Sequence, residues 1–235
     1  MQGPNQEAYD RGTSIFSPNG RLYQVEYARE AVTRGAPVVG VRSADGLALA
    51  ASTRPQSPLV ESRSIEKLHA IDDQILLGSA GHAADTRRLV DLARRAAQEE
   101  RLRYDQPVTV RELAMTIADH VQEHTQSGGA RPYGTALIVA GVDESPTLFE
   151  IDPSGATGEW RADALGAGAE AAIDRFEADY DDVADLDDAL SLALRGLQST
   201  EEEITSETVD AATVTEHGHE IVPAHRIRAL FDGEN

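Results

Sequence analysis

The chain has 235 residues, and its 40% of hydrophobic residues is enough for the core of one domain, which argues against a wholly disordered protein. With 41 acidic against 21 basic residues and a net charge of −20, it lacks the basic surface that nucleic acids and anionic membranes require. It contains no cysteine, which excludes disulfides, thiolate nucleophiles and Cys-ligated zinc.

Two further features indicate the compartment. Residues 1–30 hold no apolar signal core, and the longest apolar run, near residues 136–142, is too short to span a bilayer, so we expect a soluble, cytoplasmic protein. The acid excess, with a single lysine at position 67, is typical of a salt-rich cytoplasm, although a GC-rich genome would also favour arginine over lysine.

The first elements follow from local patterns. Residues 1–8 are polar, with Gly and Pro and no periodicity, and predict a flexible tail. Apolar residues then recur at helical spacing and predict a helix over about residues 20–34, which Gly35 ends. Two hairpins are predicted next, over 38–52 with its turn at Asp45-Gly46, and over 64–81 with its turn at Asp72-Asp73.

The remaining elements repeat this scheme. A long helix is predicted over 83–103, and the capping box Thr109–Glu112 begins another that runs to about 126. Strands are predicted over 135–144, 147–151 and 157–165, two helices over about 165–197, a last strand over 208–217 and a short helix near 224–231. Hairpins and helix pairs in two similar blocks predict one α+β domain over 9–235, a four-layer αββα sandwich with an extra N-terminal helix.

Several motifs invite functional interpretations that simpler ones outweigh. The GAGAEA stretch at 166–171 has dinucleotide-binding spacing, but a second helix follows it instead of a parallel strand, so close helix–sheet packing explains it better. His120 and His124 have the i,i+4 spacing of zinc ligands but no evident third ligand, and a solvated helix face is the preferred interpretation. The HGH at 217–219 is typical of a turn, and the acidic run at 179–188 of a solvated loop and helix start.

One mechanism of nucleophilic catalysis, in which the nucleophile is an N-terminal residue, has to be checked against the sequence. The G-x-S-x-G signature is absent. In four-layer sandwiches an N-terminal Ser, Thr or Cys can act as the nucleophile, with its own free amine as the base, and here it would open the first strand at residues 35–37. That position is Gly35-Ala36-Pro37, without a hydroxyl or thiol, so this chain is not expected to perform the reaction.

Residues 9–32, YDRGTSIFSPNGRLYQVEYAREAV, closely resemble the N-terminal signature of proteasome α-type subunits, those of archaea in particular. The resemblance continues through SIEKLHAIDDQI, GSAGHAADTRRLVDLAR and ALGAGAEA, and it covers the chain from Tyr9 to about Glu216. It implies the sandwich of N-terminal-nucleophile hydrolases, without metal or cofactor. The subunit would be non-catalytic, and the catalytic threonine would lie on partner β subunits.

The resemblance also implies partners. Seven α subunits would form an outer ring that stacks on β subunits, the N-terminal tail would gate the pore, and an activator ATPase would insert its C-terminal tails between α subunits. The gate positions that match the family are Tyr9, Asp10, Arg11, Pro18 and Tyr27. The positions that match its activator-binding pocket are Lys67, Glu26, Arg29 and Gly81.

Lysine suits the proposed pocket because its ammonium is a compact charge that can meet one carboxylate at the bottom of a narrow slot.

Two alternatives to the gating subunit stay open. An active N-terminal-nucleophile hydrolase is disfavoured by Ala36, and an assembly scaffold without a gate is disfavoured by the intact set of gate positions.

Overall fold

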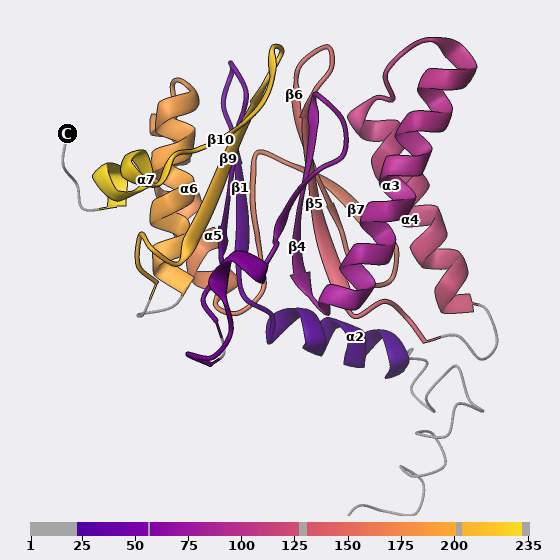
Figure 1. Cartoon of the computed structure of the whole chain (residues 1–235), viewed down its shortest axis with the longest axis horizontal. Coiled ribbons are helices and arrows are strands. Elements are labelled where there is room, and N and C mark those ends of the chain that lie inside the picture. Colours follow the sequence, from indigo (N-terminus) through magenta and orange to yellow (C-terminus); the bar gives the residue numbers. More distant parts are fainter. Residues whose placement is uncertain (1–22, 56, 127–130, 201–203, 232–235) are drawn as a thin grey trace, which may run out of the picture.

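The computed structural model describes residues 23–55, 57–126, 131–200 and 204–231. Within them the chain forms two sheets that lie face to face with helices on both outer faces (Figure 1). The four-layer αββα sandwich is therefore confirmed. The predicted tail over 1–8 lies outside the described residues.

The first sheet has the strand order β10-β9-β2-β1-β8, and every pairing in it is antiparallel. Its strands are β1 (Val38–Arg42), β2 (Leu47–Ser52), β8 (Ala162–Leu165), β9 (Val209–Thr215) and β10 (Gly218–Ile221). The β1–β2 hairpin has the register Val39↔Ala50 and turns at Asp45-Gly46, as predicted. Helices α5 (Ala169–Asp179), α6 (Leu186–Thr200) and α7 (Ala224–Phe231) cover its outer face.

The second sheet has the order β3-β4-β5-β6-β7 and is also antiparallel throughout. Its strands are β3 (Leu68–Ala70), β4 (Ile75–Gly81), β5 (Thr135–Val142), β6 (Pro146–Ile151) and β7 (Thr157–Trp160). Helices α3 (Ala83–Tyr104) and α4 (Val110–Gln126) cover its outer face. At the start of α4, the Glu112 carboxylate accepts from the Thr109 N–H at 3.2 Å, while the Thr109 hydroxyl accepts from the Glu112 N–H at 3.2 Å, so the capping box is confirmed.

Three apolar layers hold the sandwich together, one under each group of helices and one between the sheets. Strand β5 shows why its sequence is a continuous apolar run: all eight residues are buried, because one face meets α3 and α4 and the other meets the opposite sheet. Among the described residues, no helix is long and apolar enough to cross a membrane.

Two predicted strands differ from the structure. The strand expected over 157–165 is divided at Arg161: β7 pairs with β6 in the second sheet, and β8 pairs with β1 in the first. This segment therefore carries the chain from one sheet to the other, which a single alternating pattern does not reveal. The strand expected from residue 64 shortens to β3, and a 3₁₀ turn at Ser62–Ser64 precedes it.

The N-terminal helix α2 (Tyr23–Thr33) lies across one end of the strands (Figure 1). Its buried residues Val25, Ala28 and Val32 recur at helical spacing and face the sandwich, as predicted. After α2 the chain passes through Gly35 into β1, and the Ala167 N–H donates to the Gly35 carbonyl at 2.8 Å. The end of α2 is thereby tied to the segment that follows β8.

Candidate functional site

Lys67 lies in a cavity of about 420 Å³ between the β3–β4 edge of the second sheet and helix α3. Its Nζ donates to two backbone carbonyl oxygens, of Ala36 at 3.4 Å and of Ser79 at 3.3 Å. Because an ammonium has three N–H donors, two long bonds to carbonyls leave one donor available. Strand β3 begins at the next residue, Leu68, and therefore fixes the backbone position of Lys67.

The electrostatics of Lys67 are those of a cation without an anion. It forms no ion pair with any residue that the structure describes, and burial lowers the pKa of its ammonium. The charged residues that line the cavity with it are Glu66, Arg87, Asp91 and Arg94. In a chain with a net charge of −20, a cavity that gathers three cations against two carboxylates is suited to an incoming anion.

Gly81 lines the same cavity at the end of β4, so the structure brings together two of the four predicted pocket residues. Its φ of +114° is a conformation that favours glycine. A Cβ at this position would lie 2.2 Å from the Gly134 carbonyl oxygen. Gly81 is therefore required by the backbone, whatever binds beside it.

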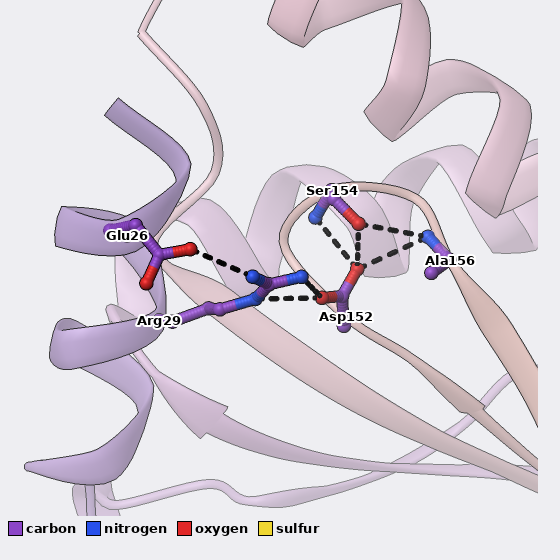
Figure 2. Close-up of polar contacts among 5 residues, drawn as sticks. All are labelled: Glu26, Arg29, Asp152, Ser154 and Ala156. Atoms are coloured by element: carbon purple, nitrogen blue, oxygen red, sulfur yellow. Dashed lines mark hydrogen bonds and ion pairs between the residues drawn. The ribbon is translucent and has the colours of Figure 1, made fainter. Parts of the chain in front are cut away.

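The other two predicted pocket residues, Glu26 and Arg29, lie on α2 and are not among the described residues that line the cavity. Instead the Arg29 guanidinium binds Asp152 at 2.6 and 3.0 Å and Glu26 at 2.9 Å (Figure 2). Within one chain they anchor α2 to the turn after β6. Burial would raise the pKa of Asp152, but hydrogen bonds from Ser154 and from Arg29 lower it.

Sequence reasoning missed Asp152. Its Oδ1 accepts from the backbone N–H groups of Ser154 and Ala156, at 2.8 and 3.1 Å, and from the Ser154 hydroxyl (Figure 2). An Asp at the first position of the DPSG turn is the signal for such a loop, since its short side chain caps the backbone of the next residues. The second carboxylate oxygen, Oδ2, is thereby oriented toward α2, where Arg29 binds it.

Sequence reasoning also missed His69, Arg87 and Arg94 in the cavity. Lys67 and His69 are two residues apart beside a strand, and this alternation would have placed them on one face. The Nε2 atom of His69 is buried and has no hydrogen-bond partner among the described residues, and burial lowers the pKa of the imidazole. Arg94 donates to the Ala70 carbonyl at 3.0 Å, which connects α3 to the edge strand.

Of the predicted gate residues, Tyr9, Asp10, Arg11 and Pro18 lie outside the described residues. Tyr27 is on the outer face of α2 and is 52% exposed. It borders a hollow of about 270 Å³ with His82 and Arg131. The Asp85 carboxylate, 3% exposed, holds the segment around this hollow, accepting from Arg131 at 2.7 and 2.8 Å and from the Gly134 N–H at 2.9 Å.

The residue just before β1 occupies the position at which an N-terminal nucleophile would lie. Ala36 follows Gly35 in the short segment between α2 and β1, so its nitrogen is part of a peptide bond and its side chain is a methyl group. Its carbonyl accepts from Lys67. A hydroxyl with a free amine, which the N-terminal-nucleophile reaction requires, is therefore absent from Ala36.

The remaining motifs have structural roles. Gly166 and Gly168 have φ values of +101° and +68°. They allow close approach to residues 35–37, between α2 and β1, and to Thr200 at the end of α6, and α6 follows α5 instead of a parallel strand. On α4, the Nε2 of His120 lies 3.1 Å from the Tyr133 hydroxyl, and the His124 ring stacks on Tyr133 at 4.6 Å. No group of three metal-ligating side chains occurs among the described residues.

Comparison with known proteins assigns the chain to one family. Residues 32–214 match the family described as proteasome subunit, and residues 9–31 match the N-terminal signature of its A-type members. Proteasome subunit alpha 2 of Haloferax volcanii is 52% identical over 98% of this chain and 93% of its own length. Proteasome subunit alpha 1 of Haloarcula marismortui is 54% identical, over 91% of this chain and 84% of its own. Proteasome subunit alpha of Haloquadratum walsbyi is 49% identical, over 94% and 90%.

Proposed function

The chain belongs to the proteasome subunit family and carries its α-type N-terminal signature, and from that premise we propose that it is a non-catalytic, gating subunit of the core particle. Seven copies, alone or with a second α subunit, form an outer ring in the cytoplasm that stacks on β subunits. The β subunits carry the catalytic threonine. Substrates pass through the ring when the N-terminal segments open, and Tyr27 on α2 belongs to that gate together with Tyr9, Asp10, Arg11 and Pro18.

Ala36 supports the non-catalytic half of this proposal. The position that would hold the nucleophile is an alanine joined to an intact helix. The alternative of an active N-terminal-nucleophile hydrolase would require both a different residue and cleavage before it, and is disfavoured for that reason.

The single observation that carries the docking half is the state of Lys67. A partly buried ammonium with no ion-pair partner among the described residues, and with an unused donor, is a site for a carboxylate. We infer that the C-terminal carboxylate of an activator ATPase binds here. Arg29, which binds Asp152, and Glu26, which binds Arg29, complete the pocket where two subunits meet, since they do not reach the cavity of their own chain.

The ring is tested by the native mass of the purified chain. In molar KCl we expect light scattering to give a mass near seven subunits or a double ring. In dilute salt the ring should dissociate, because each subunit has a net charge of −20 and repulsion is no longer screened. A monomer in molar KCl that stays monomeric when β subunits are co-expressed would contradict the ring assignment.

Docking is tested by Lys67→Met, which keeps the length of the side chain and removes its charge. A peptide that ends in a hydrophobic residue, a tyrosine and a free C-terminal residue should bind the wild-type ring at least about 30-fold more tightly than the variant ring, since truncating one partner of a buried charge pair costs at least about 2 kcal/mol. The measurement is fluorescence anisotropy of the labelled peptide.

Two controls separate the carboxylate from general effects. The same peptide with a C-terminal amide should bind both rings equally weakly. The variant Arg103→Ala, which removes an exposed cation on α3 that does not line the cavity, should bind the free-acid peptide like wild type. Equal binding of the free-acid peptide to wild type and Lys67→Met would show that Lys67 does not receive the carboxylate.

A further inference from the structure

Two carboxyl groups that the docking site and the gate do not use lie between the two sheets. Glu150 is on β6 and Asp163 is on β8, in opposite sheets. Their strand neighbours two residues away, Leu148 and Leu165, belong to the apolar core between the sheets. Because residues two apart in a strand share a face, both carboxyl groups point into that layer.

Asp163 has fewer hydrogen bonds there than a buried charged carboxylate requires. It is 3% exposed, and its Oδ2 has no hydrogen-bond partner among the described residues. A backbone N–H, that of Ala164, interacts with the carboxylate, and Gly40, opposite Asp163 on β1, brings no charge. Burial and the charge of Glu150 raise the pKa of Asp163 to about 7. An ionised carboxylate in this position would be destabilising, and a proton removes that charge.

Glu150 is the group that can share the proton. The Trp160 indole N–H donates to its carboxylate, and burial together with the charge of Asp152 raises its pKa, against the opposing charge of Arg29. Arg29 is held by Asp152 and Glu26, so it neutralises those carboxylates before this pair. The two carboxyl groups therefore lie on the inward faces of strands in opposite sheets, and no cation among the described residues forms an ion pair with either of them.

The pair also lies next to both contacts that fix α2. Asp152, two residues after Glu150, binds Arg29 near the middle of α2 (Figure 2). On the other strand, the segment after Asp163 reaches Ala167, whose N–H donates to the Gly35 carbonyl at the end of α2. A change in the separation of β6 and β8 would therefore act on the two anchors of this helix at once.

We propose that Asp163 and Glu150 share one proton across the sheet interface and act as a pH-sensitive latch beneath α2. When the pair loses this proton to solvent, both carboxyl groups are negative, and their repulsion moves β6 and β8 apart and loosens the two anchors of α2. The latch requires neither ring formation nor docking, so it stands apart from the function proposed above.

Trp160 reports the state of the pair, because it is the single tryptophan of the chain and donates to Glu150. The emission of the full-length protein at constant molar KCl should show a one-proton transition with its midpoint near the pKa of Asp163, about 7. Asp163→Asn should remove this transition. Glu150→Gln should move its midpoint to lower pH, because burial still raises the Asp163 pKa but the Glu150 charge no longer does. The variant Asp210→Asn is the matched control: it removes a carboxyl of raised pKa on β9, which pairs with β2, and should keep the transition.

Hydrogen exchange tests the anchors separately. After correction for the intrinsic effect of pH, the amides of α2 and of Ala167 should lose protection above the transition in wild type, and not in Asp163→Asn. Circular dichroism establishes that each variant is folded. The proposal is overturned by an unchanged transition in both carboxyl variants, by unchanged protection of α2 across the transition, or by a transition set by the KCl concentration at constant pH, which would indicate a bound cation instead of a proton.

Discussion

Replacement of Gly81 by alanine is expected to destabilise the fold by about 3 kcal/mol or more. A Cβ at this position would lie 2.2 Å from the Gly134 carbonyl oxygen and 2.9 Å from the Thr135 Cα. Both are backbone atoms at the start of β5, in Thr135 and in the residue before it, so no side-chain rotation relieves the overlap. The φ of +114° is also strained for any residue with a Cβ. For a chain of this size the melting temperature should fall by about 6 to 12 °C.

The matched control for Gly81→Ala is Gly78→Ala on the same strand. There the closest atom to an added Cβ is a methyl group of Val38 at 2.8 Å, and the backbone is not in a conformation that requires glycine. We expect a smaller loss of stability, measured by thermal denaturation at fixed protein and KCl concentrations because assembly also affects the melting temperature. If Gly81→Ala had the same melting temperature as wild type, the close approach of Gly81 to the Gly134 backbone would be contradicted.

The regular elements could be predicted from the sequence because their signals are local. The apolar spacing of Val25, Ala28 and Val32 depends only on one helix, and the Asp45-Gly46 turn only on four residues. The capping box at Thr109 is likewise contained in one turn of helix. Consistent local signals of this kind specified the layers and their order.

What could not be predicted depends on contacts between segments far apart in the chain. Whether residues 157–165 form one strand or two depends on which sheet each half joins, and the alternation of side chains is the same in both cases. The binding of Arg29 to Asp152 depends on where α2 lies across the sheets, 123 positions away in sequence. The resemblance to the family named Glu26 and Arg29, but their partner within the chain became evident only with the fold.

The cavity around Lys67 was predictable in part. Its lysine and Gly81 were identified from the family motif, and the alternation beside β3 would have added His69. Arg87 and Arg94 come from α3, and their convergence on the cavity requires knowing which face of that helix meets the sheet edge. Asp163 carried a weaker signal, a carboxylate within an otherwise apolar strand, which the sequence alone does not distinguish from an exposed edge residue.

Asp163→Asn is expected to stabilise the protein at about pH 8 by up to roughly 4 kcal/mol. Burial and the Glu150 charge raise the Asp163 pKa from 3.8 to about 7, so the folded state binds this proton more tightly than the unfolded chain does. That contribution to stability is fully present below the unfolded pKa, and it is lost as the pH rises from 3.8 through about 7. Asparagine has nearly the same shape and no charge, so it avoids the loss.

The decisive comparison is the melting temperature at about pH 5 and about pH 8 at constant KCl. The melting temperature of Asp163→Asn should exceed that of wild type mainly at the higher pH. A constant difference at both pH values would contradict the raised pKa of Asp163.

Asp85→Asn is the control, in which the substitution is expected to have the opposite effect on stability. Burial would raise the Asp85 pKa, but hydrogen bonds from Arg131 and the Gly134 N–H and the Arg131 charge lower it. Its charged form therefore contributes stability above the unfolded pKa, and its loss should destabilise the protein at about pH 8. Two buried aspartates of one fold thus respond oppositely to the same substitution, because one has a cation beside it and the other has a second carboxylate.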